Sequence, residues 1–118
     1  MPGRLETEFR AKREAGRKLL VPYITGGYPG WQDAIRACAA NGADAVEIGI
    51  PFSDPMADGM TIQRSSFVAL QKGVSLKWIF EQLDSAKGEI DAPLVMMSYL
   101  NPLLAFGYDK LADRALAA

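Results

Sequence analysis

Apolar residues recur along this chain with two periods, one typical of amphipathic helices and one typical of short strands. Helical spacing predicts helices over residues 5–16, 31–40, 61–73, 76–88 and 110–118. Short apolar runs predict strands over residues 18–25, 45–50 and 93–99. A loop is expected at 101–107, and Ser75 and Asp109 are predicted to cap the helices that follow them.

The alternation of strands and helices predicts an α/β fold, with a parallel sheet and the helices packed outside it. An N-terminal helix precedes three strand–helix units, and three units are too few to close a barrel. We therefore expect residues 1–118 to form part of a domain that stops in the helix after its third strand.

The strand predicted at 45–50 places its side chains alternately on two faces. Val46, Ile48 and Ile50 form the bulky set, which should pack under the helices. The other face carries the methyl group of Ala45, the hydrogen atom of Gly49 and the carboxylate of Glu47. Because its two neighbours are small, space is left around that carboxylate. It lies near the carboxyl end of the strand, where ligands bind in α/β barrels.

Each of the three carboxylates in EIGIPFSDPMADGMTIQ, residues 47–63, has two interpretations. Glu47 is either an acid–base group whose pKa burial would raise, or half of a buried ion pair with Lys or Arg. Asp54 is favoured as a turn residue whose carboxylate bonds nearby amides, over a role in the chemistry. Asp58 either forms a turn or holds its carboxylate over the end of the strand on a mobile loop.

Composition excludes several kinds of catalytic site. With no histidine and one cysteine, Cys38, the chain holds no Ser-His-Asp triad, Cys–His pair, zinc site or internal disulfide. We predict no metal site and assign Cys38 to helix packing. With a net charge of −1, the chain lacks the excess of basic residues that is typical of nucleic-acid binding. No apolar run is long enough to cross a membrane. The N-terminal segment lacks an apolar signal, so a cytoplasmic protein is expected.

The segments VPYITGGYPG and EIGIPFSDPMADGMTIQ, followed by an apolar strand ending in SYLNP, closely resemble the tryptophan synthase alpha subunit family. The resemblance implies a TIM (β/α)8 barrel, of which this chain is the N-terminal part, with about three βα units after an N-terminal helix. It implies a lyase of L-tryptophan biosynthesis, which cleaves indole-3-glycerol phosphate to indole and glyceraldehyde 3-phosphate by a retro-aldol reaction. The family reaction uses no cofactor, and the partner beta subunit of the α2β2 heterotetramer holds pyridoxal phosphate.

By the same resemblance, Glu47 matches the catalytic acid–base glutamate and Asp58 matches the loop aspartate that assists it. Three substrate-binding residues and two residues at the beta-subunit interface are also implied: Tyr23, Met97 and Tyr99, and Asp54 and Pro55. During cleavage C3 of the indole ring gains a proton and the neighbouring hydroxyl loses one, which a single carboxyl can serve. A second carboxylate that accepts a hydrogen bond from the indole N–H stabilises the developing positive charge.

The chain departs from the family in length, because a barrel of this type needs about 250 residues. The resemblance places the phosphate-binding residues outside this chain, so we expect the 118 residues to be inactive alone. Two other interpretations stay open. One is a stand-alone indole-glycerol phosphate lyase of the same family, and the other is a non-catalytic interaction module that docks on a partner through residues 53–58.

Overall fold

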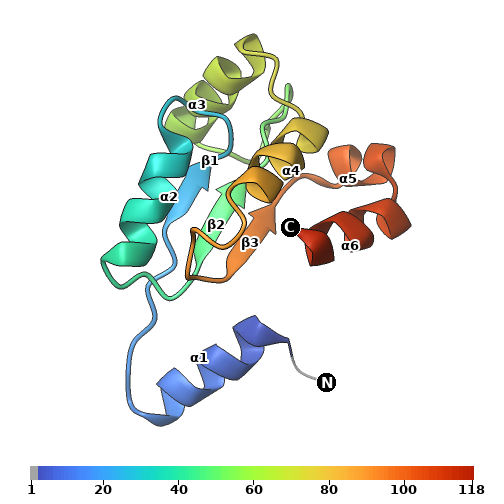
Figure 1. Cartoon of the computed structure of the whole chain (residues 1–118). Helices are drawn as coiled ribbons and strands as arrows, with labels where there is room; N and C mark the ends of the chain where they lie inside the picture. The colour runs from blue at the N-terminus through green and yellow to red at the C-terminus, as the bar shows by residue number, and fades with distance from the viewer. Residues whose placement is uncertain (1–2) are drawn as a thin grey trace.

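Three parallel strands form the sheet of this protein, in the order β1–β2–β3 (Figure 1). The computed structural model describes residues 3–118, and there the strands are β1 (Tyr23–Thr25), β2 (Val46–Gly49) and β3 (Leu94–Met97). β2 lies in the centre, and its Glu47 is level with Tyr23 of β1 and with Val95 of β3. The sheet confirms the parallel α/β fold that the alternation of elements predicts.

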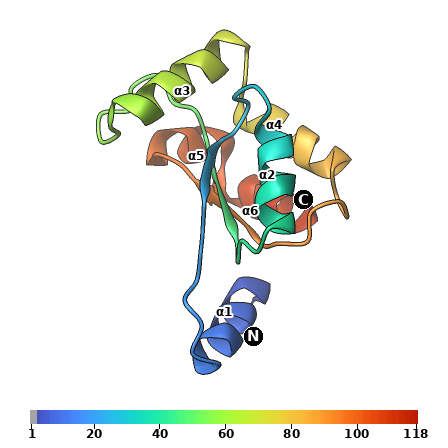
Figure 2. The same cartoon turned by 90° about the vertical axis from the view of Figure 1, so that its left-hand side faces the viewer.

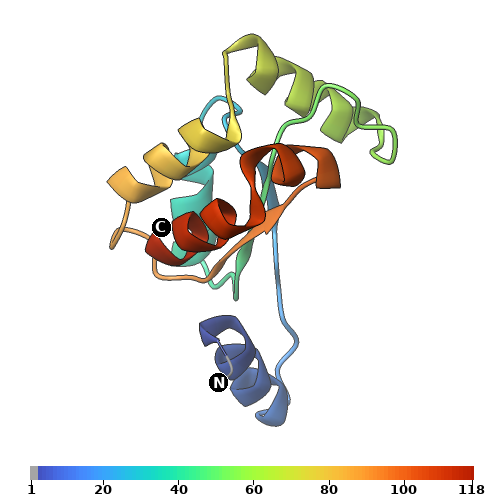
Figure 3. The same cartoon turned by 90° about the vertical axis from the view of Figure 1, so that its right-hand side faces the viewer.

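Within residues 3–118 the helices are α1 (Arg4–Glu14), α2 (Trp31–Ala40), α3 (Met60–Gln71), α4 (Leu76–Ser85), α5 (Leu100–Phe106) and α6 (Tyr108–Ala117). α2 and α4 lie on one side of the sheet (Figure 2). α3 lies beyond the carboxyl ends of the strands and α1 beyond their amino ends. α5 and α6 follow β3, and α6 runs beside α4 (Figure 3). No helix in this range has both the length and the apolar character of a membrane span.

The core lies between the sheet and the helices α2 and α4. Its largest fully buried side chains are Val46 and Ile48 from β2, Ile35 from α2, and Ile79 and Phe80 from α4. Full burial of an aliphatic or aromatic side chain stabilises a fold by about 1.5–3 kcal/mol. Alternate residues of β2 are therefore fixed toward the helices, as predicted, and Glu47 is turned to the opposite face.

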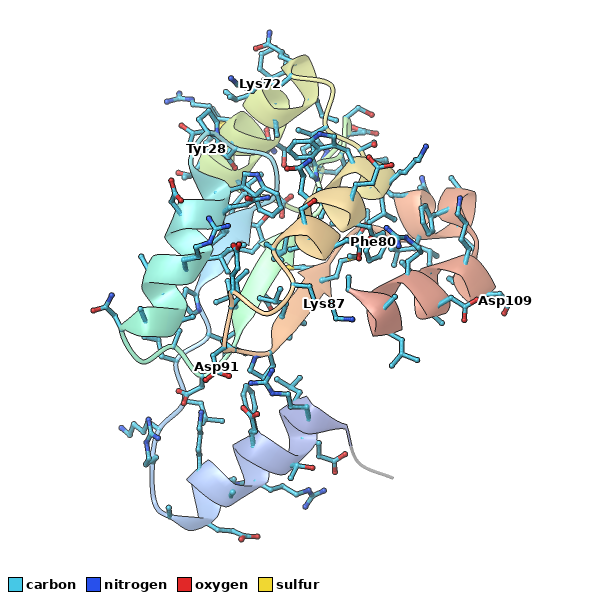
Figure 4. All side chains as sticks on the ribbon, in the orientation of Figure 1. Tyr28, Lys72, Phe80, Lys87, Asp91 and Asp109 are labelled. Atoms are coloured by element: carbon cyan, nitrogen blue, oxygen red, sulfur yellow. The ribbon has the colours of Figure 1, made fainter. Side chains whose placement is uncertain are left out.

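Phe80 also connects α6 to this core. Its ring packs against Phe106 with the centroids 5.6 Å apart, and the Arg114 guanidinium lies 5.4 Å from its centroid. In Figure 4 Phe80 lies between α4 and the pair formed by α5 and α6. Arg114 also pairs with Asp84 of α4 at 2.7 Å, so α6 is held by apolar and charged contacts together.

Several element boundaries follow local signals in the sequence. α2 spans the predicted residues 31–40. Ser75 caps α4 as predicted, because its hydroxyl accepts a hydrogen bond from the Trp78 N–H at 3.1 Å. β1 is shorter than predicted, since residues 18–22 run from α1 to the sheet outside the strand.

The loop predicted at 101–107 is wrong, because helix α5 occupies most of it. Pro102 is the third residue of α5, where the backbone N–H has no acceptor inside the helix, so proline is tolerated. Gly107 follows α5 with a φ of +95°, and α6 begins at Tyr108. Asp109 therefore does not cap α6 as predicted, but lies in its first turn, where its charge still opposes the helix dipole.

α1 is attached to the rest of the chain mainly by charged side chains. None of its residues is buried, and it stands apart from the sheet in Figure 1. Arg4 lies 3.2 Å from Asp91, which Figure 4 labels on the side of the sheet nearest α1. Lys12 lies 2.8 Å from Asp44, just before β2. The position of α1 thus depends on ion pairs at the amino ends of the strands.

Candidate active site

The carboxyl ends of the three strands bring together the side chains that the sequence analysis selects. Because adjacent strands are parallel and in register, Tyr23, Glu47 and Val95 share one face of the sheet. That face is opposite the one covered by α2 and α4, which confirms the alternation predicted for β2. Met97 lies on the same face at the end of β3, with 50% of its surface exposed.

Glu47 is less buried than its neighbours in β2. Val46 and Ile48 are fully buried, whereas Glu47 is half-buried. Glu47 is only partly buried because the face that carries it is turned away from the helices. The alternative of a buried ion pair finds no partner: within residues 3–118, the Glu47 carboxylate forms no ion pair and no hydrogen bond.

The phenol of Tyr23 lies across Gly49 of β2. A methyl group at position 49 would overlap the ring and hydroxyl of Tyr23, so glycine makes room for this side chain. Burial raises the pKa of the Tyr23 hydroxyl above its ordinary value of 10.0, while hydrogen bonding to Thr25 lowers it. The negative charges of Asp58 and Glu47 raise this pKa further, because they repel a phenolate. Tyr23 thus stays protonated at neutral pH, within electrostatic reach of both carboxylates.

A pocket of about 180 Å³ opens at this end of the sheet. Asp58 lines it from the loop after β2, and Tyr23, Met97 and Tyr99 line it from β1 and from the end of β3. The rest of the wall comes from Ile50, Phe52, Ala57, Ser66 and Ser98. Glu47 is not part of this wall, although its charge acts on the Tyr23 hydroxyl. Four of the five predicted catalytic and substrate-binding residues therefore share one pocket.

Tyr99 also holds the loop that carries Asp58. Its hydroxyl oxygen accepts a hydrogen bond from the Ala57 N–H at 2.9 Å. Its ring stacks on Phe52, with the centroids 5.2 Å apart and the planes 29° from parallel. The loop after β2 is thus fixed to the end of β3 at two points, which places Asp58 at the pocket.

Three polar residues near the pocket were not identified by sequence reasoning. The amide of Gln63 donates hydrogen bonds to the Asp58 and Pro55 carbonyls at 2.8 and 3.3 Å. The hydroxyls of Thr25 and Ser65 lie 2.7 Å apart and join β1 to α3. A side-chain amide in the first turn of a helix can reach back to the preceding loop, which is the signal that could have identified Gln63. No local signal connects Thr25 with Ser65.

The two predicted interface residues lie in the same loop as Asp58. Asp54 is exposed, and its carbonyl accepts a hydrogen bond from a backbone N–H two residues later at 2.9 Å. The predicted turn is present, but the predicted bonds from the Asp54 carboxylate to amides are not found among residues 3–118. Pro55 lines a separate groove of about 690 Å³. Other residues of this groove include Phe52, Met60 and Phe67.

At the amino end of β2, Asp44 occupies a very different carboxylate site. It is 3% exposed, its Oδ1 lies 2.8 Å from Lys12 Nζ and 3.6 Å from the Arg17 guanidinium, and its Oδ2 accepts the Leu20 N–H at 2.7 Å. The ion pair with Lys12 and the hydrogen bond from the Leu20 N–H hold the pKa of this carboxyl below its ordinary value of 3.8. Sequence reasoning did not identify Asp44, because its partners come from a much earlier part of the chain.

The chemistry available at the pocket is that of carboxylates and phenols. Among the described residues, no group of three or more His, Cys, Asp or Glu side chains could hold a metal ion. Asp58 offers a carboxylate at the apolar and aromatic walls of the pocket, and Glu47 offers a second one beside Tyr23 on the neighbouring strand. Neither is paired with a cation within residues 3–118. This arrangement suits proton transfer to an aromatic ligand and stabilisation of positive charge on it.

Comparison with known sequences shows similarity along nearly the whole chain. A family model described as tryptophan synthase alpha chain matches residues 9–118. The tryptophan synthase alpha chain of Nitratidesulfovibrio vulgaris is 42% identical over 118 residues, which cover 98% of this chain and 46% of that protein. The alpha chain of Desulfovibrio desulfuricans is 46% identical over 114 residues, covering 94% of this chain and 45% of that protein.

Solved structures with the same arrangement of elements include tryptophan synthase from M. tuberculosis in an open form. It superposes with a TM-score of 0.89 at 32% identity, over 99% of this chain and 48% of that chain. The alpha subunit from Legionella pneumophila gives a TM-score of 0.87 at 34% identity, over 98% of this chain and 46% of that chain. This chain therefore spans just under half the length of the relatives that it matches.

Proposed function

This chain belongs to the tryptophan synthase alpha chain family, and we propose that it supplies the catalytic carboxylates of a lyase that cleaves indole-3-glycerol phosphate to indole and glyceraldehyde 3-phosphate. One observation carries this proposal: Asp58 shares a pocket with the phenol of Tyr23, and Glu47 is level with Tyr23 on the neighbouring strand. That phenol lies at the carboxyl ends of parallel strands, where TIM barrels place their active sites. The fold is that of the start of such a barrel.

In this proposal Glu47 transfers both protons of the reaction. As a carboxylic acid it donates a proton to C3 of the indole ring, and as a carboxylate it then accepts the proton of the side-chain hydroxyl. The carbon–carbon bond at C3 breaks, and its electron pair returns to the ring. The electron pair of the former O–H bond forms the carbonyl of glyceraldehyde 3-phosphate. Glu47 ends in the protonation state in which it began, so the sequence of steps is balanced without a cofactor.

Asp58 is assigned the stabilisation of charge on the ring. Protonation at C3 places positive charge on the indole nitrogen, and a carboxylate that accepts a hydrogen bond from its N–H stabilises this charge. Asp58 lines the pocket together with Met97 and the phenols of Tyr23 and Tyr99. These side chains offer a partly apolar wall suited to an aromatic ring, so we assign them to substrate binding.

We further propose that the complete active site needs a longer barrel than these residues. The pocket of about 180 Å³ is smaller than the roughly 300–1,000 Å³ of usual small-molecule sites. The chain spans 46% of its relative from N. vulgaris, and we assign the phosphate-binding groups to the remaining length. Negligible turnover is expected from the 118 residues alone, because carboxylates without substrate positioning lose most of their catalytic effect.

The proposed partner is a tryptophan synthase beta subunit, which would receive indole and hold pyridoxal phosphate in a cytoplasmic α2β2 complex. No cofactor is assigned to this chain. Asp54 and Pro55 are the proposed contacts, because Asp54 is exposed and Pro55 lines a groove outside the pocket. Their loop also carries Asp58, so a bound beta subunit could influence the active site through a few residues of backbone.

The test uses a chimera in which this chain replaces the stretch that it matches in the N. vulgaris alpha chain. We expect the purified chimera to release indole from indole-3-glycerol phosphate, measured directly, and the 118-residue chain to release almost none. A chimera that is folded by circular dichroism and releases no indole would refute the proposed reaction. Near-normal release by the 118 residues alone would refute the need for a longer barrel.

A further inference from the structure

The turn formed by residues 55–58 carries Asp58 and is closed by one backbone hydrogen bond, from the Asp58 N–H to the Pro55 carbonyl at 3.1 Å. The side-chain nitrogen of Gln63 lies 2.8 Å from the Asp58 carbonyl and 3.3 Å from the Pro55 carbonyl. We propose that Gln63 is a positioning residue that fixes this turn, and with it the Asp58 carboxylate, for the lyase reaction. This inference rests on the proposed function above.

The chemistry of the contact determines how the Gln63 amide is oriented. Both nearby groups are carbonyl oxygens, which can only accept hydrogen bonds, so the NH2 end of the amide faces them. Gln63 lies in the first turn of α3, and its own N–H donates to the Gly59 carbonyl at 3.0 Å. The helix thus anchors Gln63, and its side chain holds the turn that precedes the helix.

Gln63 acts from outside the pocket. It lines the groove that Pro55 also lines, whereas Asp58 lines the pocket near Tyr23. Tyr99 holds the same turn from the pocket side, through the Ala57 N–H. The turn is therefore fixed by one side chain from α3 and one from the end of β3. Because Gln63 does not reach the pocket, its effect on catalysis must pass through the turn.

The first experiment measures amide hydrogen exchange in the 118-residue chain by NMR. Loss of a hydrogen bond to the turn in Gln63→Met should speed exchange of the Ala57 and Asp58 amides by about fivefold. Gln71→Met is the matched control, because Gln71 lies on the same helix with its side chain exposed. If the Ala57 and Asp58 amides of Gln63→Met exchange as slowly as those of the unsubstituted chain, the proposal is overturned.

The second experiment is a double-mutant cycle in the chimera. Gln63→Met should lower kcat about tenfold with little change in KM, because misplacement of a catalytic group by about 1 Å is costly. In an Asp58→Asn background the same substitution should lower kcat by less than about twofold, since it acts through Asp58. Equal losses in both backgrounds would overturn the positioning role, as would a change confined to KM.

The two experiments separate this inference from the function on which it rests. A folded chimera that makes no indole would refute the proposed reaction, whereas the exchange rates of Ala57 and Asp58 still decide whether Gln63 holds the turn. Gln71→Met in the chimera should leave kcat unchanged. If Gln71→Met lowers kcat as much as Gln63→Met does, the effect belongs to the helix in general. That result would overturn the specific role of Gln63.

Discussion

One carboxylate lies just before β2 and another lies within it, and the two have opposite surroundings. Asp44, at the amino end, is buried and paired with Lys12 and Arg17. Glu47, the second residue of β2, is half-buried and has no paired cation among residues 3–118. A buried and paired carboxylate stays ionised and supports the fold, whereas an unpaired one on an open face is accessible to a ligand. Under the proposed function, the group that stabilises the fold lies toward the amino ends of the strands and the group assigned to chemistry lies further along, as in TIM barrels.

The largest expected effect is that of Glu47→Gln on activity. In the chimera this substitution should lower the rate of indole release by about 10³-fold or more, because the amide can neither donate nor accept the transferred proton. Denaturation midpoints should change little, since the Glu47 carboxylate has no partner to lose within residues 3–118. Substantial indole release by purified Glu47→Gln protein would contradict the catalytic role assigned to Glu47, and with it the proposed difference between Glu47 and Asp44.

Asp58→Asn should reduce activity severely, but less than Glu47→Gln. The asparagine keeps an oxygen that accepts a hydrogen bond from the indole N–H, but it lacks the charge that stabilises the cationic ring. Loss of one such electrostatic group costs about 10²-fold in kcat. Steady-state kinetics of the chimera measure this directly, with Asp113→Asn on the exposed side of α6 as a control for loss of charge. A larger loss than that of Glu47→Gln would reverse the two roles.

Asp44→Asn tests the other end of the strand. It should lower the midpoint of urea denaturation more than any other substitution proposed here, because Lys12 and Arg17 lose their common partner. The kcat of the folded chimera should stay nearly unchanged. Asp33→Asn is the control, since the Asp33 carboxylate is exposed and pairs with Arg36 on the same helix. Lost activity at an unchanged midpoint would contradict the assignment of Asp44 to stability.

The contribution of Asp44 should also depend on pH. Its pKa is lowered in the folded state, so the stabilisation is fully present above the unfolded value of about 3.9 and is lost as pH falls through the lower folded value. The difference between the midpoints of the unsubstituted and Asp44→Asn proteins should thus begin to shrink below about pH 3.9 and vanish only below the lower folded pKa. Urea denaturation at several pH values measures this, and a constant difference would exclude the ion pair as its cause.

The smallest expected effect is that of Asp54→Asn. An exposed charge at an interface contributes about 0.2–1 kcal/mol, so binding of a beta subunit to the chimera should weaken by at most about fivefold. The stimulation of indole release by the beta subunit should fall with it. Increasing salt should reduce the difference in beta-subunit affinity between the unsubstituted and Asp54→Asn chimeras. No change in affinity or in stimulation would exclude Asp54 from the proposed interface.

Local patterns in the sequence were sufficient for much of the fold. The helix at 31–40 and the cap at Ser75 depend on residues within one or two turns of each other. The alternation in β2 depends on a period of two, so the facing of Glu47 was predictable. α5 was missed because Pro102 was taken as a break, although proline is tolerated in the first turn of a helix.

The environment of the candidate site was less predictable than its composition. The half-burial of Glu47 depends on which face of the sheet the helices cover, which is a property of the whole fold. The pairing of Asp44 with Lys12 joins residues far apart in the sequence. Family resemblance supplied the roles of Glu47 and Asp58, since the spacing of carboxylates alone left Asp58 open between a turn and a catalytic group.

The contact between Tyr23 and Gly49 limits how this sequence can diverge. Gly49 is buried, and the phenol of the neighbouring strand occupies the space that its side chain would take. An aromatic residue at position 23 and any side chain at position 49 are therefore incompatible on this backbone. We therefore expect the residues at positions 23 and 49 to change together, and a side chain introduced at position 49 requires a smaller residue at position 23.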